Sequence, residues 1–281
     1  MSEPRAPGPM VTSVPVVRVG RGGGADDSIA VEEPLEIRLH GRPFSVIMRT
    51  PGDDRALAAG FLLAEGVIAG AEDLGAVEHC RHPGRPEVHN VVDVYLLGTA
   101  AAGLETRLAA RRQTTTNASC GMCGRVSIES LACRAAPLAG GWTMDAAVAG
   151  SLPARLRDRQ RGFEVTGGLH AAGLFTIDGA CEVSAEDVGR HNAVDKVIGE
   201  MLLAERLPLS DYALAVSGRT SFEIVQKAWL AGIGLICAVS APSSLAIELA
   251  SEAGITLIGF ARNGGFNVYA HAARVGGRRG S

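Results

Sequence analysis

The chain has 281 residues, of which 47% are apolar and 20% charged, so it can bury a substantial core in one large or two smaller domains. Its net charge of −3 gives no general attraction to nucleic acid or anionic membranes, so an anionic ligand must be captured locally. Six irregularly spaced cysteines do not form a disulfide framework in so long a chain. Because no basic region followed by an apolar run opens the sequence, we expect no signal peptide and a cytoplasmic protein.

The first half is predicted to be rich in β-structure. Residues 1–28 are rich in proline and glycine, which is typical of a disordered tail. Alternating apolar and polar side chains over 33–39 and 43–48 predict a β-hairpin, and a helix is expected to follow as far as about residue 70. We therefore expect residues 29–139 to form a β-rich N-terminal region that ends in a cysteine-bearing loop.

The second half, residues 140–274, is predicted to be an α/β domain, followed by a flexible tail at 275–281. Its last third contains three short apolar runs, 212–216, 234–239 and 255–259, and a helical segment follows each of the first two. This βαβαβ pattern predicts a parallel sheet with helices packed on it. Residues 228–247 carry no charge, but glycines, serines and a proline interrupt them, so we interpret them as core rather than as a membrane span.

Ligands of such sheets bind beyond the carboxyl ends of the strands. Three loops rich in serine, glycine and arginine are expected at that edge, and they contain Ser217, Arg219, Ser243 and the run Phe260, Ala261, Arg262, Asn263, Gly264 and Gly265. Turns often contain glycine and serine, but three such loops at one edge favour a site where helix N-termini and backbone amides receive phosphate.

A second polar cluster spans residues 186–196. Asp187 is predicted to cap a helix, and Asp187, His191 and Asp195 are spaced four apart, so they are expected to share one face. A solvated face with ion pairs and a functional cluster both fit this pattern, and the sequence leaves the two interpretations open.

The pair Cys120 and Cys123 is the most informative motif. Two thiols three positions apart lie close together, and such a pair can hold a metal, cycle through a disulfide or carry sulfur. A cysteine attacks only as its thiolate, and the flanking Arg111, Arg112 and Arg125 would favour that form. This pattern indicates a site that faces an electrophile rather than a packed core.

Other cysteine chemistries fit less well. Zinc needs four ligands, and only one CxxC pair is present, although His79, Cys80, His82 and His89 could complete a site. A thioredoxin-like motif should follow a strand directly, whereas small polar residues precede this pair. His170-Ala171-Ala172 is similar to the H-x-E of nucleobase deaminases, but the catalytic acid is missing and the order of the motifs is reversed, which excludes that chemistry but not that fold.

Six separated segments resemble the formate dehydrogenase accessory sulfurtransferase family, FdhD, over about residues 30 to 271. They are residues 48–54, 119–124, 166–172, 186–196, 217–227 and 239–244. The resemblance implies a cytoplasmic homodimer whose larger domain is a cytidine-deaminase-like three-layer α/β domain. It further implies that the protein takes persulfide sulfur from a cysteine desulfurase and passes it to the molybdenum bis-molybdopterin guanine dinucleotide (bis-MGD) cofactor of formate dehydrogenase.

The same resemblance assigns roles to residues. It implies a persulfide on Cys120, with Cys123 as a supporting thiol, and cofactor binding by residues 260–265, where Arg262 offers its charge to a phosphate. We expect Ser217, Arg219, Ser243, His170 and His191 to contact the cofactor as well, and we expect no resident metal, nucleic acid or membrane partner. The alternative is a cofactor-binding chaperone whose CxxC is structural, around zinc.

Overall fold

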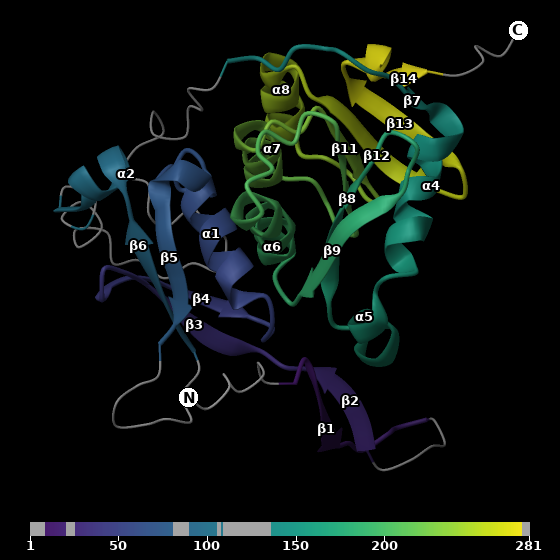
Figure 1. Ribbon diagram of the computed structural model, residues 1–281. Helices are drawn as coiled ribbons and strands as arrows, with labels where there is room; N and C mark the ends of the chain where they lie inside the picture. The colour runs from purple at the N-terminus through teal and green to yellow at the C-terminus, as the bar shows by residue number, and fades with distance from the viewer. Residues whose placement is uncertain (1–8, 21–25, 81–89, 106–107, 109–135, 277–281) are drawn as a thin grey trace, which may run out of the picture.

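The computed structural model describes residues 9–20, 26–80, 90–105, 108 and 136–276. Within these residues the chain forms a smaller N-terminal lobe and a larger α/β domain (Figure 1). Cys120, Cys123 and the remainder of the predicted thiol loop lie outside the described residues.

The N-terminal lobe is built on a four-stranded sheet with the order β4-β3-β6-β5. Its elements are β3 (Glu33–Leu39), β4 (Arg42–Arg49), α1 (Asp54–Ala64), the short helix η1 (Ala71–Asp73), β5 (Leu74–His79), β6 (Val91–Leu96) and α2 (Gly98–Ala102). The predicted hairpin is confirmed, because β3 pairs antiparallel with β4. The following helix ends at Ala64 rather than near residue 70.

The prediction of a disordered tail over 1–28 is wrong for part of that segment. Two strands, β1 (Val11–Pro15) and β2 (Asp26–Ala30), pair antiparallel as a separate two-stranded sheet that extends away from the main body in Figure 1. The predicted tail at 275–281 also begins too early, because β14 (Val275–Gly276) pairs with β7 (Met144–Asp145).

The larger domain contains a six-stranded sheet with the order β13-β12-β11-β10-β8-β9. Its remaining elements are α4 (Ala146–Arg157), α5 (Arg161–Thr166), β8 (His170–Phe175), β9 (Cys181–Asp187), α6 (Arg190–Leu203), β10 (Ala213–Val216), α7 (Phe222–Leu230), β11 (Leu235–Ala238), α8 (Ser244–Ala253), β12 (Thr256–Arg262), β13 (Gly265–Ala270) and the short helix η3 (Ala272–Arg274). The predicted βαβαβ unit is confirmed, since β10, β11 and β12 are parallel neighbours.

Helices cover both faces of this sheet, as Figure 1 shows, with α6, α7 and α8 on one side and α4 on the other. Leu214 and Val216 of β10 belong to the core under the first group, whereas Ala213 and Ala215 belong to the core under α4. Burial on both faces explains why such strands are continuous apolar runs in the sequence. The segment without charged residues, 228–247, forms the end of α7, β11 and the start of α8, as predicted.

No helix in the described part of the chain is long and apolar enough to span a membrane.

The two lobes are joined where α1 packs on α6. A Cβ atom on Gly60 would lie 2.0 Å from the carbonyl oxygen of Asp195, and one on Gly199 would lie 1.8 Å from that of Ala56. Only glycine allows the two helix backbones to approach so closely. The close contact fixes the position of α6 and therefore of the residues at its N-terminus.

Candidate functional site: the carboxyl edge of the parallel strands

The loops beyond β10 and β11 meet at one edge of the sheet, as predicted. The backbone N–H of Thr220 donates to the carbonyl of Ala241 (3.3 Å), and the N–H of Ser243 donates to the carbonyl of Thr220 (3.0 Å). The N–H of Phe260 on β12 donates to the carbonyl of Ser240 (3.2 Å), which ties the third strand to the same edge. We call this edge, with residues 217–221, 240–243 and 260, the rim.

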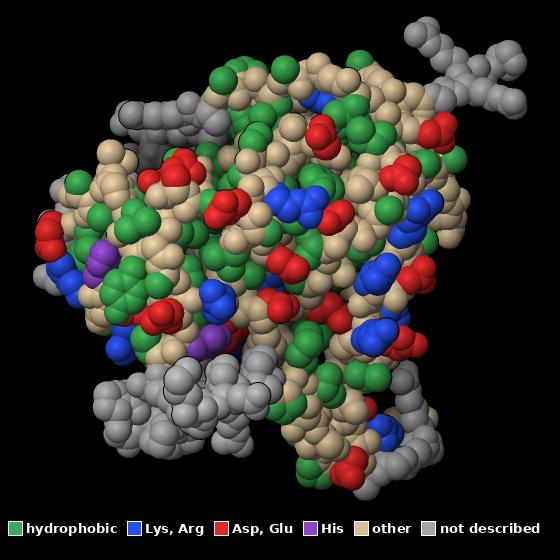
Figure 2. Space-filling model, viewed as in Figure 1, with side chains coloured by type: hydrophobic (Ala, Val, Ile, Leu, Met, Phe, Trp, Pro, Cys, Tyr) green, Lys and Arg blue, Asp and Glu red, His purple; other side chains and the backbone are tan. Residues whose placement is uncertain are grey.

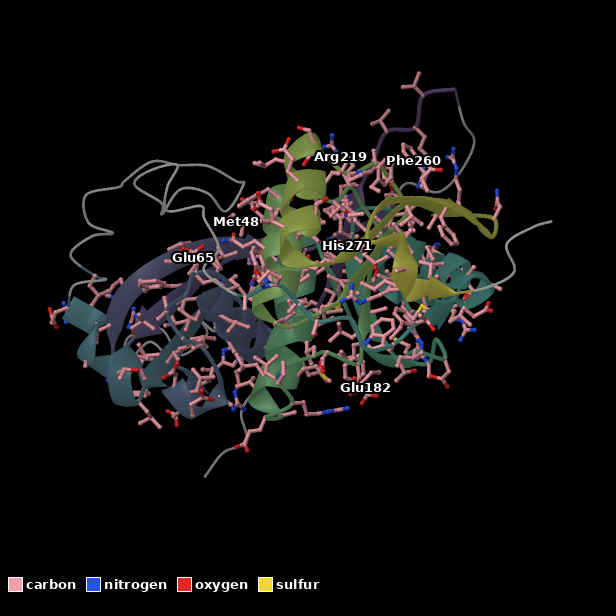
Figure 3. All side chains as sticks on the ribbon, turned by 90° about the horizontal axis from the view of Figure 1, so that it is seen from above. Met48, Glu65, Glu182, Arg219, Phe260 and His271 are labelled. Carbon is pink, nitrogen blue, oxygen red and sulfur yellow. The ribbon has the colours of Figure 1, made fainter. Side chains whose placement is uncertain are left out.

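Three helices begin at the rim, because α6, α7 and α8 follow β9, β10 and β11 respectively. Unpaired backbone N–H groups give a helix N-terminus a partial positive charge that favours anions. Seen from above in Figure 3, Arg219 and Phe260 lie at one side of the molecule, opposite Glu182. Arg219 is exposed, so it adds a positive charge to this edge.

The serine hydroxyls of the rim have structural partners. Ser217 Oγ accepts a hydrogen bond from the N–H of Ala171 (2.9 Å), and Ser243 Oγ caps α8 by accepting one from the N–H of Ala246 (3.2 Å). Both contacts fix the loops in place. The structure therefore brings Ser217 and Ser243 to the predicted edge. Their hydroxyl groups stabilise the loops there.

Residues 260–265 do not form the loop that the sequence analysis placed after the last strand. β12 continues to Arg262, and Asn263 and Gly264 make a two-residue hairpin turn into β13. Both turn residues have positive φ angles, 53° and 79°, as expected for a type I′ turn. The Asn-Gly pair was the sequence signal for this hairpin. Arg262, Asn263, Gly264 and Gly265 are all exposed, and the turn lies beside α4, where a Cβ atom on Gly150 would lie 2.9 Å from the carbonyl oxygen of Gly264.

Phe260 interrupts the regular pairing of this hairpin. It has a φ angle of +54° and lies where the register between β12 and β13 shifts. A non-glycine residue rarely adopts this left-handed conformation, and such residues cluster at ligand sites. Its side chain is 38% exposed at the rim, so the strained backbone presents an aromatic ring at the edge where ligands of such sheets bind.

His170 and His191 lie at the inner end of the rim. His170 opens β8, and a Cβ atom on Gly218 would lie 3.4 Å from its Nδ1 and 3.7 Å from Cδ of Arg190. Burial lowers the pKa of His170, and the positive charges of Arg190 and His191 lower it further. His170 is therefore neutral at pH 7. The ring of His191 contacts α7, where its Nε2 lies 2.9 Å from Glu223 Oε2 and 3.0 Å from Ser221 Oγ.

The polar cluster at 186–196 is mostly buried, so the solvated-face interpretation is wrong for it. Asp187 does not cap a helix, because it ends β9, and α6 begins at Arg190 after Gly189. Asp187 instead accepts hydrogen bonds from the N–H groups of Thr50 (3.1 Å) and Gly189 (2.8 Å) and pairs with Lys196. His191 and Asp195 do share a face, since both contact α7, through Glu223 and Lys227 respectively.

The predicted thiols Cys120 and Cys123 lie outside the described residues, and the described cysteines can be compared with what a nucleophilic thiol needs. Burial raises the pKa of Cys80, Cys181 and Cys237, to about 12 for Cys237. All three therefore remain protonated and weakly nucleophilic at neutral pH. Among the described residues no cluster of histidine, cysteine and acidic side chains could hold a metal ion. His82, His89 and the CxxC pair fall outside those residues, so the zinc hypothesis stays untested.

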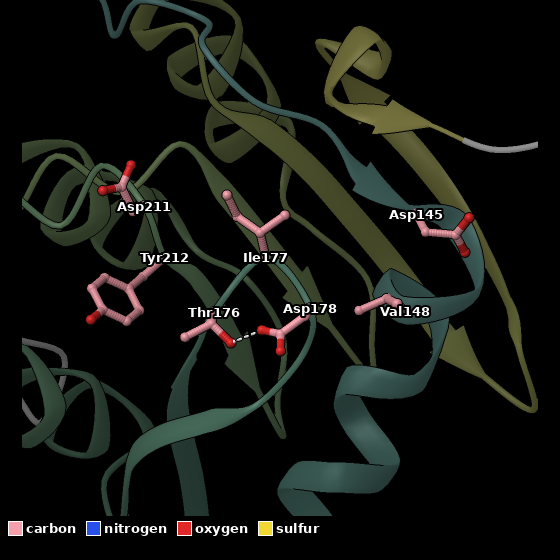
Figure 4. Close-up of a pocket in the computed structure, with 7 residues that line it drawn as sticks. All are labelled: Asp145, Val148, Thr176, Ile177, Asp178, Asp211 and Tyr212. Carbon is pink, nitrogen blue, oxygen red and sulfur yellow. Dashed lines mark hydrogen bonds between the residues drawn. The ribbon is translucent and has the colours of Figure 1, made fainter.

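A cavity of about 630 Å³ lies elsewhere, at the opposite ends of the strands. It is open and is lined by Asp145, Val148, Thr176, Ile177, Asp178, Asp211 and Tyr212 (Figure 4). Three aspartates make it a poor match for an anionic ligand.

On the face shown in Figure 2, acidic and basic side chains are interspersed, which agrees with the small net charge of the chain. An anionic ligand would therefore have to be bound by charges close to its own site.

The larger domain is therefore of the α/β class, with a mixed sheet in which three helix N-termini and basic side chains lie at the carboxyl edge of the parallel strands β10, β11 and β12. Comparison with known proteins identifies the family. Residues 30–276 match the FdhD/NarQ family, and the chain belongs to it.

Named relatives are similar over almost the whole chain. The chain is 50% identical to the sulfur carrier protein FdhD of Anaeromyxobacter dehalogenans strain 2CP-C, with 96% of each sequence covered. It is 47% identical to the protein of the same name from Streptomyces avermitilis, covering 92% of this chain and 93% of the relative. The crystal structure of a putative formate dehydrogenase accessory protein from Desulfotalea psychrophila matches with a TM-score of 0.70 and 28% identity, over 94% of this chain and 98% of that one.

Proposed function

We propose that this protein is a sulfur carrier that receives sulfur on Cys120 from a cysteine desulfurase and delivers it to the molybdenum bis-MGD cofactor of a formate dehydrogenase. The observation that carries this proposal is the relationship to proteins named sulfur carrier protein FdhD, which extends over 96% of the chain for the relative from A. dehalogenans. The proposal includes a cytoplasmic location and a homodimer.

Loading of Cys120 requires only a thiolate and a donor persulfide. The Cys120 thiolate attacks the outer sulfur of the donor, a new S–S bond forms at Cys120, and the electron pair of the broken bond leaves with the donor thiolate. No external oxidant or reductant is needed. Burial raises the pKa values of Cys80, Cys181 and Cys237, so these three thiols are poor nucleophiles, and the candidates that remain are Cys133 and the CxxC pair.

The rim supports the second half of the proposal. A cofactor with two guanine nucleotides carries diphosphate groups and flat bases. The rim offers the N-termini of α6, α7 and α8, the exposed Arg219 and the exposed ring of Phe260. Helix N-termini and guanidinium groups bind phosphate, and an aromatic ring can stack on a base. Arg262, at the start of the hairpin turn, is the further candidate for a phosphate contact.

The test is restoration of formate dehydrogenase activity in cells that lack their own accessory protein. The wild-type chain should restore activity, and Cys120→Ala should not. Zinc content of the purified protein is measured in parallel. Stoichiometric zinc that is lost in both Cys120→Ala and Cys123→Ala would show that the thiols are metal ligands. That result would overturn the carrier proposal in favour of a chaperone with a structural zinc site.

A further inference from the structure

The cavity of Figure 4 has no role in the proposed function, and its charge is opposite to that of the rim. We call it the acidic groove. Three exposed aspartates surround a lining that is otherwise mostly apolar, and the residues are Asp145, Val148, Thr176, Ile177, Asp178, Asp211 and Tyr212. Figure 4 places Ile177 and Asp178 between the other two aspartates. Such a lining suits a cation on an apolar stem, which is the form of an arginine or lysine side chain.

The three carboxylates of the groove have no counter-ion nearby. Among the residues that the structure describes, none of them forms an ion pair. Asp145 accepts a hydrogen bond from the N–H of Ala147 (2.7 Å), and Asp178 accepts one from the hydroxyl of Thr176. The hydrogen bond from Thr176 lowers the pKa of Asp178, so this carboxylate is charged at neutral pH.

Two arginines beside the groove are engaged elsewhere. Arg155 on α4 donates to the carbonyl of Gly179 (2.6 Å), and its charge is only a minor cause of the lowered pKa of Asp178. Arg206 pairs with Glu182 (2.6 Å) and lies over the ring of Tyr212. The groove therefore carries more negative charge than its described neighbours compensate.

The strand β14 ends at the edge of this groove. In its parallel pairing with β7, Val275 lies opposite Met144 and Gly276 lies opposite Asp145. A Cβ atom on Gly276 would lie 3.6 Å from the Cβ of Thr143, which agrees with this register. Because Asp145 itself lines the groove, the chain continues beyond Gly276 from a point directly beside it.

The segment that follows is basic. Residues 277–281 have the sequence Gly-Arg-Arg-Gly-Ser, which contains Arg278 and Arg279 and no acidic side chain. An extended chain covers at most about 3.6 Å per residue, so the two arginines lie within roughly 7 and 11 Å of the Gly276 backbone. So short a connection gives the arginines a high effective concentration at the groove. Opposite charges are thus held within reach of one another.

We propose that the acidic groove is the docking site of the basic segment 277–281 of the same chain. The guanidinium groups of Arg278 and Arg279 face the three aspartates, and their aliphatic stems cover Val148 and Ile177. The segment thereby covers Ile177, an apolar side chain that is 36% exposed in the groove. Docking also fastens the two-residue strand β14 to the start of α4. The proposal is independent of the carrier function, because the groove lies away from the rim.

Trypsin cleaves after arginine, so its rate on this segment measures docking in the full-length protein. Mass spectrometry follows the loss of residues 279–281 or 280–281, and a free peptide with the sequence of residues 275–281 gives the rate without docking. Cleavage in the protein should be at least about threefold slower than in the peptide, as expected for two exposed ion pairs on a short connection. High salt should reduce this difference, because it screens exposed charges.

A variant of the groove tests whether its charge gives this protection. The substitutions Asp145→Asn, Asp178→Asn and Asp211→Asn remove the three charges with little change of shape, and asparagine still caps α4. Cleavage in this variant should approach the rate of the peptide. The matched control replaces three exposed acids outside the groove, with the substitutions Asp158→Asn, Glu164→Gln and Glu248→Gln. The control should keep the wild-type rate, and a groove variant cleaved no faster than the control would overturn the proposal.

Hydrogen exchange tests the contact without altering any residue of the groove. In the variant Arg278→Gln/Arg279→Gln, the backbone amides of the turn 176–179 should exchange faster than in the wild type, because they lose their cover. Equal exchange in the two proteins would contradict docking. The dependence of trypsin protection on protein concentration then identifies the groove that is occupied. Constant protection supports docking within one chain, whereas protection lost on dilution would place the segment in a second copy and overturn the assignment.

Discussion

Asp187 and Lys196 form a buried ion pair, with 2.9 Å between Oδ2 and Nζ and side chains that are 0% and 1% exposed. Lys196 also donates to the carbonyl of Thr50 (2.9 Å), whose own N–H donates to Asp187. The pair therefore joins the end of β9, the helix α6 and the segment between β4 and α1. It sets the place where α6 begins, and with it the positions of Arg190 and His191.

Asp187→Asn should destabilise the protein by about 3–5 kcal/mol, because Lys196 would remain buried without its counter-charge. Urea unfolding measures the change. The control is Glu182→Gln, which breaks the exposed pair of Glu182 with Arg206 and should cost less than about 1 kcal/mol. Equal losses in the two variants would show that the buried pair does not hold this junction.

Gly199→Ala should destabilise the contact between α1 and α6. The new methyl group would lie 1.8 Å from the Ala56 carbonyl oxygen, so the helices must separate, at a cost of about 1–3 kcal/mol or more. Gly141→Ala is the control, since nothing lies within 4 Å of the added Cβ atom. A thermal unfolding midpoint for Gly199→Ala equal to that of the control would contradict the close packing of the two helices.

Cys237 should resist alkylation in the folded protein. Burial raises its pKa to about 12, so at pH 8 almost none of it is thiolate. The protein is treated with iodoacetamide with and without urea, and the labelled peptides are identified by mass spectrometry. We expect label on Cys237 only after unfolding. Rapid labelling of Cys237 without urea would show that β11 is not enclosed as described.

Arg262→Ala should weaken GDP binding by roughly tenfold, the equivalent of a lost charge-assisted contact of about 1.5–3 kcal/mol, without preventing persulfide formation on Cys120. Calorimetry follows binding, and mass spectrometry follows loading in the same preparation. Unchanged GDP affinity would mean that the nucleotide does not contact the exposed start of the hairpin turn. Failure of loading would mean that the two activities are not separable.

The central strands β10 and β11 could be predicted from the sequence because they are buried on both faces. Runs such as Leu235–Ala238 are then apolar throughout, and the turns between them contain glycine and serine. The hairpin at Asn263-Gly264 was not predicted, although an Asn-Gly pair is a hairpin signal: the positive φ angles of the two residues turn the chain back into β13 where a loop was expected. Local sequence patterns predict a strand or a turn correctly where the conformation is determined by residues that are neighbours in the sequence.

The contacts of the polar cluster at 186–196 could not be predicted in the same way. Asp187 was expected to cap a helix, because an acid before a helical segment is a common cap signal. Its actual partner Thr50 is 137 residues away in the sequence. The contact between His191 and Glu223 likewise joins two helices that follow different strands. Such contacts depend on the assembled sheet, so local sequence patterns show the residue types but not their partners.

The assignment of the persulfide to Cys120 is tested most directly by mass spectrometry of the protein after incubation with a cysteine desulfurase and cysteine. The peptide that contains Cys120 should gain the mass of one sulfur atom, and the gain should disappear after treatment with a reducing thiol. Cys120→Ala should show no such gain, whereas Cys123→Ala should still be loaded on Cys120. A stable gain of one sulfur atom in Cys120→Ala, or no gain in the wild type, would contradict the account.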